Sequence, residues 1–384
     1  MGGRITICYP FAGDSLGGSH QSLLGLLKGL DQTRYRLLIV VEHPGGRIAQ
    51  HFAGFEVVPD PAPPRESFEA GRAFGLGKFA STFAGIGKRA AFLREQGVDI
   101  VHTNDGRTHA TWSLAAKRAG AKLVWHHRGD PTAKGLRWLA PLVADQIVTV
   151  SRFSLPPHKG SRAAREAQVV FSPFDVDVSV DRAAARRRLL DELELPEDAL
   201  VCGYFGLFIA RKRPLAFIDT IARLRQLTSR PVAGLLFGVA EHPELLAEME
   251  ARIADPALGG AVRLMGYRSP GAEWIAACDQ LLVPAIDEPL GRTLVEAMVV
   301  GTPVIATRSG GNPEAILDGL GVIVPPDDPQ VMAMACATLA ESPPEKLAAM
   351  VERARKSARE RFAAARHVSA ISAIYERLAG QKPA

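Results

Sequence analysis

The stretch Glu288-Pro-Leu-Gly-Arg-Thr-Leu-Val-Glu296 places two carboxylates eight residues apart, with a glycine between them. Apolar segments precede and follow it. This pattern predicts a strand, then a loop that carries Glu288, then a helix that begins near Gly291 and carries Glu296. The unpaired N–H groups and the macrodipole of a helix N-terminus favour an anion. The pattern therefore indicates a ligand with a phosphate and flanking hydroxyl groups, such as a nucleotide-sugar.

Two glutamates at this spacing are also common on solvated helices. The neighbouring sequence is therefore needed to distinguish a ligand site from a solvated helix. The turn Gly301-Thr302-Pro303 leads into a second apolar strand, and the turn Ser309-Gly-Gly-Asn-Pro-Glu314 begins a second helix. A further apolar run, Gly321 to Asp328, ends in Pro-Pro-Asp-Asp. Residues 281–326 resemble the signature of retaining glycosyltransferases of family 4, which combine E-P-x-G-x-x-x-x-E, A-M-x-x-G-x-P-V-I-A, G-G-x-x-E and P-P-D.

The resemblance implies an α/β protein of the GT-B fold, with two Rossmann-like domains that face a central cleft. We expect an N-terminal, acceptor-side domain over residues 1–172 and a nucleotide-sugar-binding domain over residues 173–360. A C-terminal helix, residues 361–384, is expected to cross back to the first domain. The length of 384 residues independently favours two domains.

The order of the elements also indicates two parallel sheets, because near-continuous apolar runs alternate with helical patterns. The expected strands are 5–10, 36–42, 55–58, 98–102, 122–126, 146–150, 200–205, 232–238, 262–266, 280–284, 303–307 and 321–324. The main expected helices are 17–30, 71–96, 109–119, 135–143, 214–227 and 241–253. Residues 171–196 are expected to be a linker, and residues 344–378 a long helix that is broken near 362–364.

The bulk composition limits the class of protein. Residues 1–180 contain 22 Lys and Arg against 15 Asp and Glu, and the remainder contains 24 against 26. The basic first half could attract a phosphate-bearing acceptor or an anionic membrane, or simply aid solubility. No apolar run approaches a bilayer span, no secretory signal is seen, and the four cysteines are scattered. We expect a cytoplasmic protein, either free or peripheral at the inner membrane face.

The departing nucleoside diphosphate of a glycosyl transfer needs positive charge nearby. Lys212 matches the lysine with which the family holds the diphosphate, but Leu207 stands where the family has an arginine. Arg211 is the candidate replacement, although a basic loop before a helix can also be merely solvated. By the resemblance, Glu288 binds the transferred sugar and Glu296 binds the ribose. The expected catalytic residues are Glu288, Lys212, Arg211 and Asn104.

Further donor contacts are expected from glycine turns and helix starts. Gly17 and Gly18 follow the first strand and begin a helix, which is an ordinary helix start as well as the place where the family faces the diphosphate. The full set of expected donor-binding residues is Gly17, Gly18, Gly206, Gly266, Tyr267, Pro289, Leu290, Gly291, Arg292, Thr293 and Glu296.

The first domain gives weaker signals. Many family members have a second histidine where this chain has Asn104, so Asn104 or Asp105 would contact the sugar instead. His109, His127 and Arg128 are candidates for the acceptor side, while an ion pair between Arg128 and Asp130 is an equally simple reading. Basic and aromatic residues over 72–94 suggest either a membrane-contacting face or a helix that covers the sheet.

No metal or other cofactor is expected. The pair Asp175 and Asp177 follows Ser172-Pro-Phe at an interdomain position, and we interpret it as structural. The sequence therefore predicts a glycosyltransferase that moves a sugar from a nucleotide-diphosphate donor, preferably a UDP-sugar, to a glycan, lipid-linked or small-molecule acceptor, with retention. Nucleic acid is not an expected partner.

Two alternatives stay open. One is a non-catalytic nucleotide-sugar-binding protein of the same fold. The other is a nicotinamide-dependent oxidoreductase, although the glycines after the first strand lack the G-x-G-x-x-G spacing.

Overall fold

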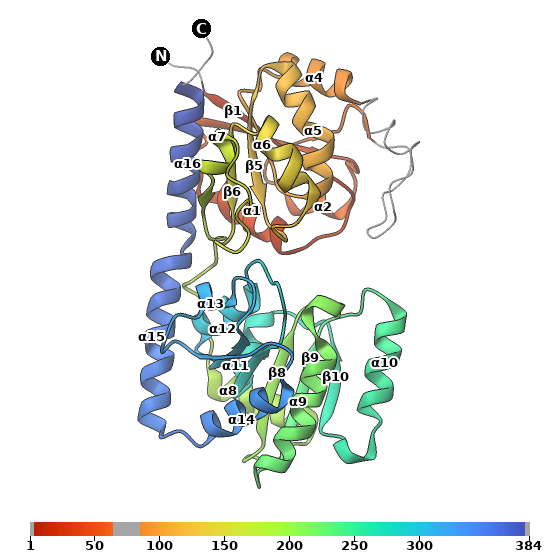
Figure 1. The fold of residues 1–384 in the computed structure, drawn as a ribbon, viewed down its shortest axis with the longest axis vertical. Coiled ribbons are helices and arrows are strands. Elements are labelled where there is room, and N and C mark those ends of the chain that lie inside the picture. Colours follow the sequence, from red (N-terminus) through yellow and green to blue (C-terminus); the bar gives the residue numbers. More distant parts are fainter. Residues whose placement is uncertain (1–3, 64–84, 381–384) are drawn as a thin grey trace. The chain divides into compact units, whose positions relative to one another are not determined.

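The computed structural model describes residues 4–63 and 85–380, which belong to two compact units (Figure 1). Unit 1 consists of residues 1–173 and 364–384, and unit 2 of residues 174–363. The sequence placed the corresponding boundaries after residues 172 and 360.

Unit 1 is built on a seven-stranded sheet in which every pair of neighbouring strands is parallel. In sheet order the strands are β3 (Glu56–Pro59), β2 (Tyr35–Val41), β1 (Ile5–Phe11), β4 (Ile100–Thr103), β5 (Lys122–His127), β6 (Gln146–Thr149) and β7 (Gln168–Val169). Alternate residues of β1 join different cores: Ile7 and Tyr9 belong to one, and Cys8 to the other. The sheet is therefore covered on both faces, which explains its continuous apolar strands.

The helices of unit 1 pack on these two cores. They are α1 (Gly18–Gly29), α2 (Arg47–His51), α4 (Ile86–Glu95), α5 (Gly106–Ala119), the π-helical turn η1 (Gly135–Leu139), α6 (Ala140–Val143), α7 (Arg162–Arg165) and α16 (Ala364–Gly380). The last helix, α16, packs against α1 and buries Ile371, Ile374 and Tyr375 in the core of unit 1. The predicted return of the C-terminal helix to the first domain is confirmed.

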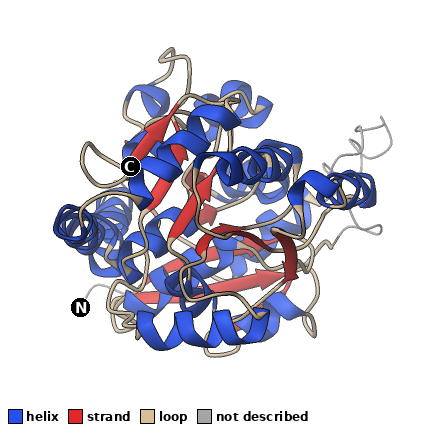
Figure 2. Ribbon diagram, turned by 90° about the horizontal axis from the view of Figure 1, so that it is seen from below, coloured by secondary structure: helices blue, strands red, loops and turns tan. Residues whose placement is uncertain are grey.

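Unit 2 repeats the architecture with six parallel strands. In sheet order they are β10 (Val262–Gly266), β9 (Val232–Phe237), β8 (Leu200–Phe205), β11 (Gln280–Val283), β12 (Val304–Thr307) and β13 (Val322–Val324). The helices are α8 (Arg182–Leu193), α9 (Pro214–Leu227), α10 (Pro243–Ile253), α11 (Gly271–Ala277), α12 (Arg292–Val300), α13 (Asn312–Ala315), α14 (Pro329–Ala340) and α15 (Pro344–Phe362), with 3-10 turns η2 (Ala210–Lys212) and η3 (Pro256–Leu258). Helices lie on either side of the strands (Figure 2).

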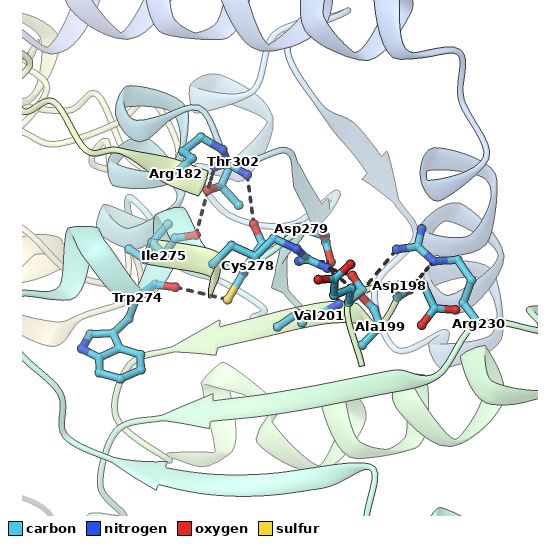
Figure 3. A network of polar contacts seen from close by, with 12 residues as sticks. Arg182, Asp198, Ala199, Val201, Arg230, Trp274, Ile275, Cys278, Asp279 and Thr302 are labelled. Carbon is cyan, nitrogen blue, oxygen red and sulfur yellow. Dashed lines mark hydrogen bonds and ion pairs between the residues drawn. The ribbon is translucent and has the colours of Figure 1, made fainter. Parts of the chain in front are cut away.

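The prediction that residues 171–196 form a linker is wrong for residues 182–193, because these form α8, which belongs to unit 2. Arg182 donates to Thr302 and to the carbonyl of Cys278 (3.1 Å), as Figure 3 shows. Arg186 pairs with Asp279 at 2.8 Å, and the same carboxylate accepts the backbone N–H of Val201. Arg182 and Arg186 therefore fasten α8 to the segments that precede β11 and β12.

The other differences have local causes. Helix α5 begins before the expected residue 109, because the side chain of Asp105 accepts the N–H groups of Arg107 and Thr108. The long C-terminal helix is interrupted at Ala363, as predicted. Of the expected helix 71–96, the structure describes α4, and residues 71–84 lie outside the described residues, as does much of the proposed basic and aromatic face.

Two glycines at the carboxyl ends of β8 and β9 permit a close backbone approach. Gly206 has φ +145° and Gly238 has φ +153°, a region that side chains disfavour. A Cβ atom added to Gly238 would lie 1.9 Å from the carbonyl oxygen of Gly206. Glycine is thus required where the loops after β8 and β9 meet.

We expect Gly238→Ala to destabilise unit 2, because the added methyl group must push the Gly206 carbonyl away and keep a strained φ. The loss should be about 1–3 kcal/mol in the free energy of unfolding, measured by urea denaturation. Gly271→Ala is the matched control, since its Cβ meets nothing within 4 Å. Equal stability of the two variants would contradict this account of the turn.

Candidate functional site

Apart from Gly17 and Gly18, which belong to unit 1, the residues predicted to bind the donor belong to unit 2 and lie at or after the ends of its strands or in α12. Lys212 follows β8, and Glu288 and Gly291 follow β11, the strand that pairs with β8. Parallel strands present their carboxyl ends at one edge of the sheet, where open α/β sheets bind ligands. Residues 75 or more positions apart in the chain thus lie together, as the contact between Arg211 and Glu288 (77 positions apart) shows.

Glu288 is the centre of this group. Its side chain is 10% exposed and forms an ion pair with Arg211, while the Lys212 Nζ lies 3.6 Å from the same carboxylate oxygen. A buried carboxylate requires such partners, because desolvation is costly. The arrangement holds one acid between two cations, with part of each side chain open to solvent.

The second glycine turn contacts the backbone of Glu288. The backbone N–H of Gly311 donates to the Glu288 carbonyl at 2.7 Å. Gly310 has φ +59°, and a Cβ there would lie 2.6 Å from the Glu288 nitrogen. The Gly-Gly pair is therefore explained by its contact with the backbone of the acidic loop.

A pocket in unit 2 opens beside this group. Its lining residues are Tyr204, Phe205, Lys212, Leu282, Val283, Pro284, Ala285, Glu288, Gly291 and Thr293. Gly291 is the N-cap of α12, and no side chain caps the helix. The first turn of α12 contains no acid, so its N–H groups and dipole leave a place for an anion beside Lys212.

The other predicted residues of the acidic loop have different placements. Pro289 and Leu290 are buried and are not among the residues that line the pocket. The guanidinium of Arg292 lies 4.2 Å from the centre of the Phe174 ring, and burial lowers its pKa. Glu296 is a half-buried acid on α12, 3.4 Å from Arg292. Arg292 can therefore offer its backbone to a phosphate, while its side chain packs within unit 2.

Three exposed apolar side chains follow the glycines that end neighbouring strands. Leu207 follows Gly206, Val239 follows Gly238, and Tyr267 follows Gly266; they are 49%, 50% and 79% exposed. Because β8, β9 and β10 are adjacent, these residues form a row at the same edge as Lys212. Tyr267 offers an open ring face suited to stacking.

In unit 1, Asn104 and Arg128 lie together. The Arg128 guanidinium donates to the Asn104 Oδ1 at 3.3 Å from two nitrogens and to the Ser172 Oγ at 3.2 Å. It also lies 3.3 Å from the Nδ1 of His126. Asn104, only 3% exposed, therefore helps to hold Arg128 at the ends of β4 and β5.

A chain of hydrogen bonds behind Arg128 was not predicted from the sequence. Because Arg128 can only donate, the His126 Nδ1 accepts, and the His102 Nε2 donates to it at 3.1 Å. The other nitrogen of His102 then accepts from Tyr375 on α16, whose hydroxyl is 2.9 Å from that of Tyr9. Burial and the charge of Arg128 hold the pKa of His102 and His126 well below the ordinary value. The adjacent histidines were a signal in the sequence, but nothing there pointed to Tyr375.

The two remaining acceptor-side histidines have internal partners. His109 is 4% exposed, stacks on Trp125 with ring centres 4.0 Å apart, and bonds to Thr103 at 2.7 Å. This placement weighs against the acceptor contact predicted for His109, which lies inside the first turn of α5 rather than at its start. The His127 Nε2 bonds to the Asp130 carbonyl at 2.8 Å, and burial lowers its pKa.

Gly17 and Gly18 lie at the start of α1, and the space beside Gly17 is open. Gly17 is the N-cap of α1, which begins at Gly18, and a Cβ at Gly17 would meet nothing within 4 Å. Its backbone N–H donates to the His20 Nδ1 at 3.1 Å. Gly17 is thus free of the crowding that makes glycine obligatory at Gly238.

Metal-binding clusters and membrane-spanning helices are absent from residues 4–63 and 85–380. No group of three or more His, Cys, Asp or Glu residues in this part of the chain is arranged to hold a metal ion. No helix within it is both long and apolar enough to span a membrane. The Asp175 carboxylate accepts the backbone N–H of Asp177 at 3.2 Å, a local turn contact.

Comparisons with known sequences give the following. The profile described as "Glycosyl transferases group 1" matches residues 199–342. A D-inositol 3-phosphate glycosyltransferase from Kribbella flavida is 33% identical over 68% of this chain and 68% of its own. Its namesake from Stackebrandtia nassauensis is 32% identical over 58% of this chain and 55% of that protein. The chain thus spans little more than half the length of this second relative, and 40% of a similar one from Nocardioides.

Solved structures extend the likeness to the whole fold. Anabaena HepE, crystallised with UDP and glucose, has a TM-score of 0.80 at 22% identity, covering 97% of this chain and 100% of its own. Sucrose-phosphate synthase from Thermosynechococcus elongatus has a TM-score of 0.78 at 19% identity, covering 98% and 99%. At such identities the likeness concerns the fold. The predicted α/β architecture of two Rossmann-like domains, as in GT-B proteins, is confirmed.

The buried histidines of unit 1 predict a loss of stability in mild acid. Burial lowers the pKa of His367 from 6.5 to about 3. His367 therefore binds a proton in the unfolded chain at a pH at which it stays neutral in the folded chain. The free energy of unfolding consequently falls as pH drops from about 6.5 toward 3. We expect His367→Gln to flatten the decline of Tm between about pH 7 and 5. The exposed His158, changed to Gln, is the control; identical slopes for both variants would contradict the assignment.

Proposed function

Because the chain belongs to the group 1 glycosyltransferases, as its 33% identity over 68% of the Kribbella protein establishes, we propose that it transfers a sugar from a nucleotide-diphosphate donor to an acceptor hydroxyl. The observation that carries the proposal is the pocket of unit 2, where Lys212 and Glu288 lie beside the uncapped start of α12. This pocket offers charge for a diphosphate and a carboxylate for sugar hydroxyls.

The proposed chemistry follows from that layout. The bond between the anomeric carbon and the β-phosphate oxygen breaks, and the acceptor oxygen forms the new glycosidic bond. Lys212, the N–H groups of Gly291 to Thr293 and the dipole of α12 stabilise the charge that develops on the departing diphosphate. Glu288 binds hydroxyls of the transferred sugar, and Glu296 binds those of the ribose.

We further propose that the anomeric configuration is retained, as in family 4. The acceptor then attacks from the face that the diphosphate leaves, and a phosphate oxygen takes the acceptor proton. This route needs no carboxylate nucleophile. Glu288 serves as a hydroxyl ligand in it, because its carboxylate is already engaged by Arg211.

The donor that we favour is a UDP-sugar, in keeping with HepE, whose crystals contained UDP and glucose. Tyr267, at the end of β10, offers a surface for the base. For the acceptor, the name D-inositol 3-phosphate glycosyltransferase, carried by the Kribbella relative, points to a hydroxyl compound that bears a phosphate. Arg128 is the cation of unit 1 that we assign to the acceptor side, with Asn104 holding it.

A second candidate function is binding without catalysis. Leu207 is half exposed where the family has a diphosphate-binding arginine, and Asn104 stands where the family has a histidine. Both departures would weaken turnover more than donor binding. Family membership, in contrast, argues against the nicotinamide-dependent alternative.

The decisive test is a screen of nucleotide-sugars for released nucleoside diphosphate, with and without pooled glycan, lipid-linked and inositol-phosphate acceptors. We expect one donor to give slow hydrolysis alone and faster release with an acceptor. Binding of a donor with no release under any condition would favour the non-catalytic alternative. An absence of both binding and release across the panel would overturn the proposal.

The two glutamates should affect different kinetic constants. Hydrogen bonds to charged groups contribute roughly 1.5–3 kcal/mol, so each loss should cost about tenfold to a hundredfold. We expect Glu288→Gln to lower kcat, because its contact is to the reacting sugar, and Glu296→Gln to raise the donor KM. The exposed Glu250→Gln on α10 is the control. Near-normal constants in both site variants would refute the assigned contacts.

The contact between Arg211 and Glu288 predicts non-additive kinetics. Arg211→Gln should lower kcat/KM by roughly tenfold or more, because Glu288 loses its closest cation. If the two side chains act as a pair, the double variant with Glu288→Gln should be little worse than the worse single variant. Full additivity of the two free energies would show that Arg211 acts independently, and matched Tm values would exclude a loss of folding.

A further inference from the structure

The segment that follows β5 in unit 1 exposes two large apolar side chains. Over η1 and α6, Leu136, Ala140 and Val143 join the core, while Trp138 is 63% exposed and Leu142 is 81% exposed. Four residues separate Trp138 from Leu142, which places them on the same side of a helical segment. A tryptophan and a leucine exposed at this spacing indicate a surface that binds a partner.

Basic side chains lie on this segment and on the helix that packs against it. Lys134 and Arg137 are exposed on the same segment. Helix α7 packs against α6 (both labelled in Figure 1). On α7, Arg162 and Arg165 are exposed. The Arg137 guanidinium lies 5.0 Å from the centre of the Trp138 ring. We call these six residues the Trp138 patch: Lys134, Arg137, Trp138, Leu142, Arg162 and Arg165.

The acids of this region do not cancel the charge of the patch. Residues 131–166 contain six Lys and Arg but only two Asp and Glu. Asp145 pairs with Lys117 at 2.9 Å, and Glu166 pairs with Arg162 at 2.9 Å. Lys134, Arg137 and Arg165 therefore leave a net positive rim around the apolar pair.

We propose that the Trp138 patch docks unit 1 on an anionic lipid bilayer. An amphipathic aromatic ring is suited to the boundary between headgroups and acyl chains, and the basic rim is suited to anionic headgroups. A second copy of this chain is the poorer occupant, because it would bring two positive rims together. The Trp138 patch contains none of residues 72–94, on which the sequence first suggested a membrane contact.

The place of the patch in the chain gives it a functional consequence. The segment begins just after Arg128, which holds the acceptor-side position in the proposed function. Docking would bring the carboxyl ends of β4 and β5 to the lipid surface. Resting on that proposed function, this position favours a lipid-linked acceptor over a soluble one.

The distribution of tryptophans provides a direct probe. The chain contains four tryptophans, and Trp112, Trp125 and Trp274 are buried at 1%, 1% and 7% exposure. A change of tryptophan emission on vesicle binding should therefore come from Trp138. We expect a blue shift and protection from iodide with vesicles of phosphatidylglycerol and phosphatidylcholine, but little change with phosphatidylcholine alone.

Three variants separate the contributions in a co-sedimentation assay. Trp138→Phe should bind the anionic vesicles but lose the emission shift. Trp138→Gln combined with Leu142→Gln should weaken binding by roughly tenfold or more, as should combined Lys134→Gln and Arg137→Gln. The control is Met334→Gln, which changes an exposed apolar residue of unit 2. Higher salt should weaken binding of the natural chain.

Two kinds of result would contradict the docking proposal, and they can be told apart. Binding that is absent, or that is equal in the double-Gln variants and the natural chain, would overturn the docking proposal. Concentration-dependent dimerisation abolished by the Trp138 and Leu142 changes would assign the patch to a second copy instead. Diphosphate release measured without vesicles reports on the proposed transferase activity separately, so failure of one proposal does not imply failure of the other.

Discussion

The ion pair between Glu288 and Arg211 is the interaction on which the proposed donor site depends. A carboxylate in a nearly buried loop is tolerable only with a cation against it, and the structure supplies Arg211 and, at 3.6 Å, Lys212. Because these cations come from the loop after β8 and the acid from the loop after β11, the pair also joins two adjacent strand ends. The uncapped start of α12 completes a pocket whose lining includes both Lys212 and Glu288.

Glycines allow the backbone around this site to adopt its conformation. Gly310 and Gly311 lie directly against Glu288, and Gly206 and Gly238 let the ends of β8 and β9 approach. Leu207, Val239 and Tyr267 then project from the same edge, beside a pocket that includes Lys212. An apolar row next to a charged pocket suits a ligand with a base at one end and a diphosphate in the middle.

The sequence predicted the strands and the acidic loop well, because both are local patterns. Apolar runs bounded by glycine and proline are readable without tertiary information, and so is a glycine at the start of α12. The direction in which a side chain points depends on tertiary contacts, which a local pattern does not reveal. His109 points inward because it stacks on Trp125 and bonds to Thr103. Likewise, α8 was mistaken for a linker because the partners of its arginines, Asp279 and Thr302, are about a hundred residues away. The network from Tyr375 to Arg128 required α16 to return to unit 1, which only the resemblance suggested.

The proposed function depends on where the diphosphate binds. A crystal structure of the protein with a bound UDP-sugar would test it most directly. We expect the diphosphate at the first turn of α12, within hydrogen-bond distance of the Lys212 ammonium, with sugar hydroxyls bound to Glu288. A diphosphate bound elsewhere, with Lys212 and Glu288 making no contact to the ligand, would contradict it.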